Sequence, residues 1–254
     1  MLQKNGNPIY NIHTPKVNKH NDLLIPYIPM LPNTNPLRIL VLDNDETTGD
    51  YQCGSFLFEL YKFCYKKNPP HGYFITKYLI GKNGIRPGTI DLLKIAYALK
   101  KLGKIDHIMI FTAASNDKGW VTYLIECLLK LADLPSNTIS NIITKENCIS
   151  AKKKSRVIKD LSMICSDTSN ILIIDDKPEF IRNGKYISVN PYHVQMSIKD
   201  LVDDFTCSKE KRKIIDYSIQ EDKKKYPDCF TKYTKNEDMN EMYSVIREVT
   251  QFFS

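Results

Sequence analysis

The stretch Ile39-Leu40-Val41-Leu42-Asp43-Asn44-Asp45-Glu46-Thr47 decides the fold, because four consecutive apolar residues run directly into a group of acidic ones. A short, continuous apolar run is typical of a strand buried on both faces of a sheet. Similar runs follow at Ile108–Phe111, Ile171–Ile174 and Tyr186–Val189. We therefore expect a sheet built from several short, buried strands.

Helical periodicity fills the segments between these runs, at Thr89–Lys101, Trp120–Leu131 and Arg156–Met163. Strands that alternate with helices of this length indicate a parallel, doubly wound α/β sheet.

The two ends of the chain differ from this central part. Residues 1–36 contain six prolines, which forbid a helix and predict an extended arm; its apolar patch Leu23–Leu31 is expected to dock on the core. From residue 195 the chain is predicted to be helical and charged. It ends in an amphipathic packing face made of Met242, Val245, Ile246, Val249 and Phe253. The predicted organisation is an arm over 1–36, a central domain over 37–195 and a helical extension over 196–254 that packs on the core.

The composition of the 254 residues excludes several classes of protein. With 42% hydrophobic and 26% charged residues, the chain is globular and not wholly disordered. No stretch approaches the roughly 18 uncharged residues of a membrane helix, and the first residues lack the apolar core of a signal peptide. We expect an intracellular protein, of the cytoplasm or nucleus, with no membrane partner. Seven cysteines, none in a Cys-x-x-Cys pair, favour reduced thiols over a disulfide framework.

The formal net charge is +7, from 36 lysines and arginines against 29 acidic residues. This balance permits a nucleic acid or a phosphorylated protein as partner. A solvated lysine surface is the simpler interpretation, and it also fits the mixed run Lys209–Lys213. The sequence carries no signal for the oligomeric state.

Acidic or hydroxyl side chains follow three of the predicted strands. They are Asp43-Asn-Asp45-Glu-Thr47, Thr112-Ala-Ala-Ser115 and Asp175-Asp176-Lys177-Pro178. In an open α/β sheet, ligands bind beyond the carboxyl ends of the strands. A solvated turn with a threonine cap is the alternative for each string alone, but three such strings at one sheet edge favour a functional site.

These segments resemble, in order, the motifs of the haloacid dehalogenase (HAD) superfamily, and more narrowly the phosphatases that act on the C-terminal domain of RNA polymerase II. The resemblance runs from about residue 38 to 195 and rests on Val41–Thr47, Arg86-Pro-Gly88, Phe111-Thr-Ala113, Val157-Ile-Lys-Asp-Leu-Ser162 and Ile174-Asp-Asp-Lys-Pro178. It implies a HAD-type, Rossmann-like, doubly wound parallel sheet with a small insertion after the first motif and a helical C-terminal tail.

The resemblance also implies a Mg²⁺-dependent phosphomonoester hydrolase that works through an aspartyl-phosphate. Asp43 would be the nucleophile, and Asp45 the general acid and base. The metal would be held by Asp43, the backbone carbonyl of Asp45 and Asp176, with Asp175 nearby. Thr112 and Lys159 would bind the phosphoryl group. A shifted alignment would move the lysine role to Lys152, Lys153 or Lys154, and Lys177 is interpreted as a surface residue beside the site.

Four residues depart from the family pattern. Asn44 and Thr48 replace leucines, Asp176 replaces an asparagine, and Lys145 stands where an arginine is usual. Asp176 keeps an oxygen ligand, so metal binding should survive. Asn44 and Lys145 bear on substrate preference more than on the chemistry.

The leading interpretation is a protein serine/threonine phosphatase acting on an extended phosphopeptide. The alternatives are a nucleic-acid 3′-phosphatase with the same catalytic set and a catalytically inactive HAD-fold binding protein; the presence of Asp45, Thr112, Asp175 and Asp176 favours an enzyme. Spacing points to a macromolecular substrate. One helix, one short strand and loops fill most of the 47 positions from Thr112 to Lys159, and residues 48–85 are too few for a large closing domain.

Overall fold

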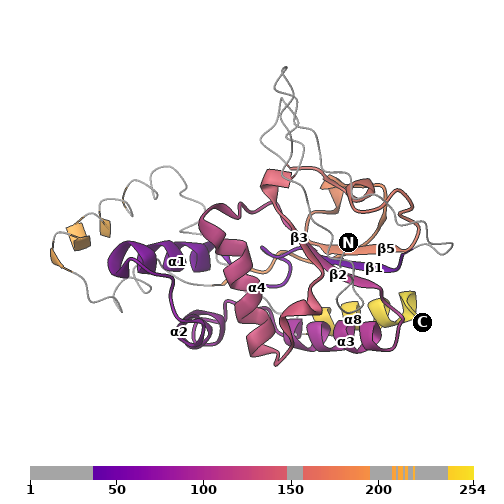
Figure 1. Ribbon diagram of the computed structural model, residues 1–254, viewed down its shortest axis with the longest axis horizontal. Coiled ribbons are helices and arrows are strands. Elements are labelled where there is room, and N and C mark those ends of the chain that lie inside the picture. Colours follow the sequence, from indigo (N-terminus) through magenta and orange to yellow (C-terminus); the bar gives the residue numbers. More distant parts are fainter. Residues whose placement is uncertain are drawn as a thin grey trace, which may run out of the picture.

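A five-stranded parallel sheet forms the centre of the computed structural model, which describes residues 37–147, 157–194, 208–209, 211–213, 215–216, 220 and 240–254 (Figure 1). The strands are β1 (Ile39–Leu42), β2 (His107–Phe111), β3 (Asn141–Ile143), β5 (Ile171–Asp175) and β7 (Lys185–Ser188). Their order across the sheet is β3-β2-β1-β5-β7. The predicted parallel α/β sheet is confirmed, and β3 is the short strand expected between Thr112 and Lys159.

The register of the sheet aligns the ends of its central strands. Leu42 of β1 lies beside Ile110 of β2 on one side and Ile174 of β5 on the other. Because these strands are parallel, the residues that follow them emerge at one edge of the sheet. Asp43 and Asp175 are therefore neighbours at that edge.

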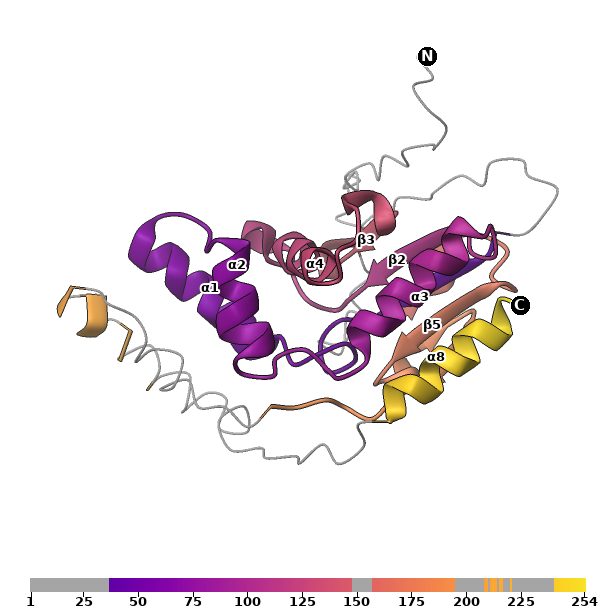
Figure 2. The same ribbon diagram turned by 90° about the horizontal axis from the view of Figure 1, so that it is seen from below.

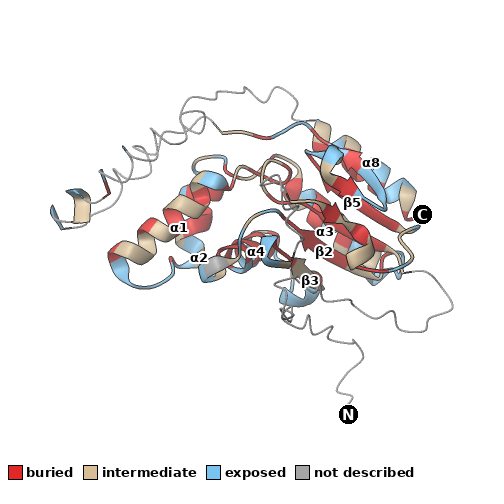
Figure 3. Cartoon of the chain, turned by 90° about the horizontal axis from the view of Figure 1, so that it is seen from above, coloured by how far each residue is buried: buried red, intermediate tan, exposed pale blue. Residues whose placement is uncertain are grey.

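Helices cover one face of the sheet. The helices are α1 (Gln52–Tyr65), α2 (His71–Phe74) with a π-helical continuation over Ile75–Ile80, α3 (Thr89–Lys101), α4 (Trp120–Leu131) and α8 (Glu241–Phe252). Helices α3 and α4 have the bounds that periodicity predicts. Helix α8 lies beside α3 (Figure 2), and the predicted packing face of its amphipathic stretch is confirmed, because all five of its apolar residues are buried (Figure 3).

The insertion after β1 packs on helix α4 through aromatic side chains. Phe58 of α1 and Phe74 of α2 both pack against Trp120 and Tyr123 of α4 in tilted or edge-on geometry, with ring centroids 4.8 to 5.7 Å apart. Tyr78, in the π-helical segment, is completely buried. Aromatic contacts of this kind add to area burial, so the insertion is joined to the core of the domain.

The opposite face of the sheet is covered differently from the prediction. Over residues 157–163, the expected helix is replaced by a two-residue strand, β4 (Lys159–Asp160), and a 3₁₀ turn at Leu161–Met163. Strand β4 pairs with β6 (Ile181–Arg182). The Asp160 carboxylate accepts hydrogen bonds from the backbone N–H (3.0 Å) and the hydroxyl (2.7 Å) of Ser162. Such local bonds compete with a helix, which explains the wrong prediction.

Several sequence predictions fall on residues outside the described ranges. These are the arm over 1–36, Lys152–Lys154, and most of the extension from 196 to 239, so the three domain boundaries stay predictions. Among the residues that are described, no helix is long and apolar enough to cross a membrane. Among the described cysteines, Cys53, Cys64, Cys127 and Cys165 form no disulfide.

Candidate active site

The turn after β1 carries the first group of site residues. Asp43 extends the strand, since its N–H donates to the carbonyl of Ile174 at 3.0 Å. The chain then closes on itself, with the N–H groups of Thr47 and Thr48 both donating to the carbonyl of Asn44. The Thr47 hydroxyl lies 3.3 Å from Asp43 Oδ2 and 3.1 Å from Asp176 Oδ1, and it accepts the N–H of Asp176. Thr47 therefore links the carboxylates that follow β1 and β5.

Lys159 reaches this group from β4. Its Nζ lies 2.8 Å from Asp43 Oδ1 and 2.5 Å from Asp175 Oδ2, and all three side chains are almost fully buried. Burial raises the pKa of Asp43, an effect that Lys159 opposes and that Asp175 reinforces. Burial alone would lower the pKa of Lys159, but the two carboxylates outweigh it and raise that pKa. The structure thus brings Lys159 to the predicted nucleophile as a charged ammonium.

Three carboxylates are placed where a cation could bind. Oxygen atoms of Asp43, Asp175 and Asp176 lie within 4.8 Å of one another, and all three residues are buried. Asp43 Oδ1 and Asp176 Oδ2 are each paired with a lysine ammonium, Lys159 at 2.8 Å and Lys177 at 2.9 Å, and a carboxylate oxygen paired in this way keeps a lone pair for a further contact. Oxygen donors of this kind suit a hard divalent cation. The residues present therefore fit a metal ion.

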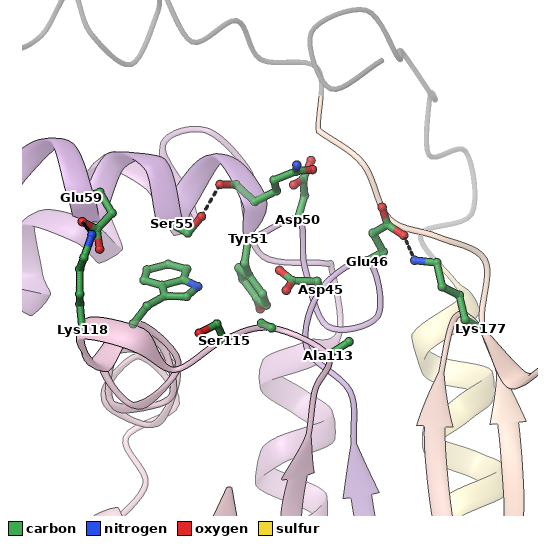
Figure 4. Close-up of a pocket in the computed structure, with 13 residues that line it drawn as sticks. Asp45, Glu46, Asp50, Tyr51, Ser55, Glu59, Ala113, Ser115, Lys118 and Lys177 are labelled. Atoms are coloured by element: carbon green, nitrogen blue, oxygen red, sulfur yellow. Dashed lines mark hydrogen bonds and ion pairs between the residues drawn. The ribbon is translucent and has the colours of Figure 1, made fainter. Parts of the chain in front are cut away.

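Asp45 lies outside this carboxylate cluster and faces a pocket of about 510 Å³. Figure 4 shows its carboxyl between Tyr51 and the loop that carries Ala113. Burial, reinforced by the charge of Asp43, raises the pKa of Asp45 to about 7. A carboxyl with this pKa can both give and take a proton near neutral pH. The predicted metal contact through the Asp45 backbone carbonyl stays a prediction.

Thr112 lies at the same edge of the sheet. Its N–H donates to the carbonyl of Ile143, and its side-chain oxygen accepts the N–H of Ala114 at 3.1 Å. Ala113 and Ala114 line the pocket beside Asp45. Thr112 is thus placed at the start of the pocket-lining loop, and its predicted contact with a phosphoryl group stays a prediction.

Lys177 is more closely tied to the site than its interpretation as a surface residue implies. It is half exposed, but its Nζ lies 2.9 Å from Asp176 Oδ2 and also pairs with Glu46. Burial alone would lower the pKa of Lys177, but its bonds to Glu46 and Asp176 raise it. The sequence does contain one indication of this link, because Lys177 directly follows Asp176.

Two further residues position the site and were not assigned a role from the sequence. One is Thr47, visible only as the last residue of the first motif. The other is Arg86, from the Arg-Pro-Gly segment, whose Nη1 donates to the carbonyl of Thr47 at 2.8 Å and whose N–H donates to that of Thr48 at 3.0 Å. Both act through backbone or hydroxyl contacts that only the folded turn creates.

Two of the departures from the family pattern, Asn44 and Lys145, do not line the pocket that Asp45 faces. Asn44 is buried beside Leu93 and Ile110, and neither atom of its side-chain amide has a hydrogen-bond partner among the described residues. Lys145 is exposed in a 3₁₀ turn after β3. Neither lines the pocket that Asp45 faces, so neither is placed to contact a substrate there directly.

A parallel α/β sheet with three buried carboxylates and a buried lysine gathered at one edge defines an enzyme suited to phosphoryl transfer. The comparison with known families agrees: a model of the NLI interacting factor-like phosphatases matches residues 38–218, more than half of the chain. The chain belongs to this family, a HAD-like family of metal-dependent phosphatases that includes those acting on the RNA polymerase C-terminal domain. The predicted resemblance is confirmed, and the protein is a phosphatase. A search of curated proteins finds no match to the chain.

Proposed function

We propose that this phosphatase hydrolyses phosphoserine or phosphothreonine in an extended peptide, using Mg²⁺ and an aspartyl-phosphate. The observation that carries the proposal is the environment of Asp43. One of its oxygens lies 2.8 Å from the Lys159 ammonium, while the other lies beside the Thr47 hydroxyl. This carboxylate is oriented by both contacts and keeps lone pairs for attack on phosphorus.

The chain's own residues supply the remaining steps. A carboxylate oxygen of Asp43 bonds to phosphorus as the bond to the serine oxygen breaks, and protonated Asp45 gives its proton to that leaving oxygen. Water then attacks the phosphoryl group, Asp45 takes the proton of the water, and the bond between phosphorus and Asp43 breaks. Inorganic phosphate leaves, and both carboxyl groups return to their starting state.

Charge neutralisation decides whether this attack is possible, because nucleophile and substrate are both anionic. Asp43, Asp175, Asp176 and the Asp45 carbonyl would hold Mg²⁺, which when bound supplies the charge that offsets this repulsion. Lys159 would hold the phosphoryl oxygens as the second positive charge, and Thr112 would donate a hydrogen bond to them.

The shape and charge of the pocket favour a peptide over the alternatives. Four carboxylates and two lysines line it among the described residues, and Lys118 and Lys177 are already paired with Glu59 and Glu46. This acidic lining disfavours a polyanionic nucleic acid. The aromatic packing that joins the insertion to α4 leaves an open wall and not a closing lid, so the remote groups of a small metabolite would gain few contacts.

A substrate panel tests the proposal. We expect kcat/KM to be much higher on phosphoserine and phosphothreonine peptides than on sugar phosphates, free nucleotides or 3′-phosphorylated DNA. Activity should vanish in EDTA and return with Mg²⁺. Asp133→Asn serves as a control for purity and folding, because Asp133 is exposed and its left-handed backbone (φ +55°) suits asparagine. A preference for DNA would favour the nucleic-acid phosphatase, and no turnover of any substrate would favour an inactive binding protein.

A further inference from the structure

Helix α8 lies beyond the residues that the family model matches, which end at residue 218, yet it belongs to the main core. Met242, Val245 and Val249 are buried against the same apolar cluster as α3. Helix α8 approaches the residue before α3 closely, because a Cβ on Gly88 would lie 2.9 Å from Met242 Cβ. Gly88 also has φ +84°, a backbone conformation that favours glycine. The segment after Arg86 is therefore shaped to receive α8.

The first residue of α8, Glu241, uses both carboxylate oxygens. Its Oε2 lies 3.0 Å from Arg86 Nη2, and its Oε1 accepts the backbone N–H (2.7 Å) and the side-chain amide (3.0 Å) of Asn190. Arg86 Nη2 also donates to the carbonyl of Asn190. The Arg86 and Glu241 side chains are only 5% and 17% exposed. Charge-assisted bonds in such a setting are stronger and better oriented than those of a surface pair.

Arg86 carries this contact to the turn after β1. Its other terminal nitrogen, Nη1, holds the carbonyl of Thr47 at 2.8 Å. The hydroxyl of the same Thr47 contacts Asp43 and Asp176. Arg86 and Thr47 therefore connect Glu241 to the carboxylates of the site through successive contacts.

A second route reaches the same turn through the segment after β7. Asn190 donates hydrogen bonds to Glu241. Two residues further on, the N–H of Tyr192 donates to the carbonyl of Glu46 at 2.7 Å. Glu46 has φ +65°, a left-handed conformation uncommon in residues other than glycine. Such a conformation persists only when its surroundings hold it. Arg86 and Tyr192 bond to the turn at Thr47 and Glu46. Glu241 contacts Arg86 directly and contacts Asn190, two residues before Tyr192.

We propose that Glu241 is a positioning residue for Asp43 and Asp176, acting through Arg86 on Thr47, whose hydroxyl contacts both carboxylates. The inference rests on the proposed roles of these two aspartates. Without the Glu241 carboxylate, the Arg86 guanidinium loses the counter-charge that aims Nη1 at Thr47, and the Thr47 hydroxyl is released from its place between the aspartates. The C-terminal helix is then part of the catalytic assembly as well as of the core.

The test uses the full chain and the substitution Glu241→Gln, which keeps the size of the side chain and removes its charge. The matched control is Val249→Ala, which weakens the packing of the same helix at a completely buried residue with no polar contact to the turn. Both variants are compared with wild type well below their melting temperatures. The measurements are Mg²⁺ affinity of the metal-free protein by calorimetry, and kcat and KM on a phosphoserine peptide.

We expect Glu241→Gln to lower kcat and Mg²⁺ affinity by about tenfold each, the effect typical of a lost partner behind metal ligands, with KM little changed. Val249→Ala should lower the melting temperature and leave both quantities near wild type. In an Arg86→Met background, Glu241→Gln should add little, because its route to the turn is already broken.

Two results overturn the inference and leave the proposed function intact. One is an active wild type whose kcat and Mg²⁺ affinity are unchanged by Glu241→Gln. The other is equal losses in Glu241→Gln and Val249→Ala, which would reduce Glu241 to a structural role. A wild type that neither binds Mg²⁺ nor turns over phosphopeptide overturns the proposed function itself.

Discussion

The Lys159 ammonium lies 2.8 Å from Asp43 Oδ1 in a setting where both side chains are almost fully buried. Because the same ammonium is 2.5 Å from Asp175, it is shared by two carboxylates of the site. A third, Asp176, pairs with Lys177 at the rim. The three carboxylates gathered beyond β1 and β5 are therefore only partly offset by two lysines, one of which also pairs with Glu46.

Replacing the nucleophile should abolish turnover. In Asp43→Asn the amide cannot form the aspartyl-phosphate, so we expect kcat on a phosphoserine peptide to fall by about 10⁴-fold or more. In Asp45→Asn we expect kcat to fall by about 10²- to 10⁴-fold, because this substitution removes only the proton transfer. With an activated ester, it should also accumulate a phosphoenzyme detectable by mass spectrometry. Near-normal, metal-dependent turnover by pure Asp43→Asn would contradict the mechanism.

The loss of Lys159 should reduce stability as well as activity. Lys159→Met leaves Asp43 and Asp175 buried without their counter-charge, which typically lowers the free energy of unfolding by about 3 kcal/mol or more. Urea denaturation at neutral pH measures the change, with the exposed Lys145→Met as the control that should stay near wild type. Added Mg²⁺ should recover part of the lost stability, since it binds the same carboxylates in the folded state only.

The pH dependence should report the proton on Asp45. Its pKa is raised to about 7, and the acid form is the active one for leaving-group protonation. We therefore expect kcat/KM on phosphoserine peptides to fall as the pH rises through 7, by about tenfold per unit beyond it. p-Nitrophenyl phosphate, whose leaving group needs no proton, should show a much weaker alkaline decline. Identical profiles for the two substrates would argue against Asp45 as the acid.

Asn44 should be a stabilising site for engineering. Its amide is buried without a hydrogen-bond partner among the described residues. Asn44→Leu removes an unsatisfied polar group and adds apolar burial, so the free energy of unfolding should rise by about 1–2 kcal/mol. Asn44→Asp should lower it, because it buries a charge. Calorimetric melting compares the three proteins, and kcat should stay near wild type for Asn44→Leu.

The sequence by itself determined the elements whose pattern is local. The helices Thr89–Lys101 and Trp120–Leu131 have the predicted bounds, because helical periodicity depends only on the spacing of apolar residues within one segment. The residues after β1, β2 and β5 could be placed at one edge for a topological reason, since parallel strands end together. Asp43, Asp175 and Asp176 were predicted as neighbours on that ground and from the family motifs, and they are neighbours.

Only the tertiary structure decided the rest, because it depends on contacts between distant segments. Lys159 lies in an extended strand where periodicity predicts a helix, and from there its ammonium reaches two buried carboxylates. The raised pKa of Asp45 comes from burial and from the charge of Asp43, which no local pattern encodes. The pair of Arg86 and Glu241 joins residues 155 positions apart. Electrostatic partners are selected by proximity in space, and proximity exists only once the chain has folded.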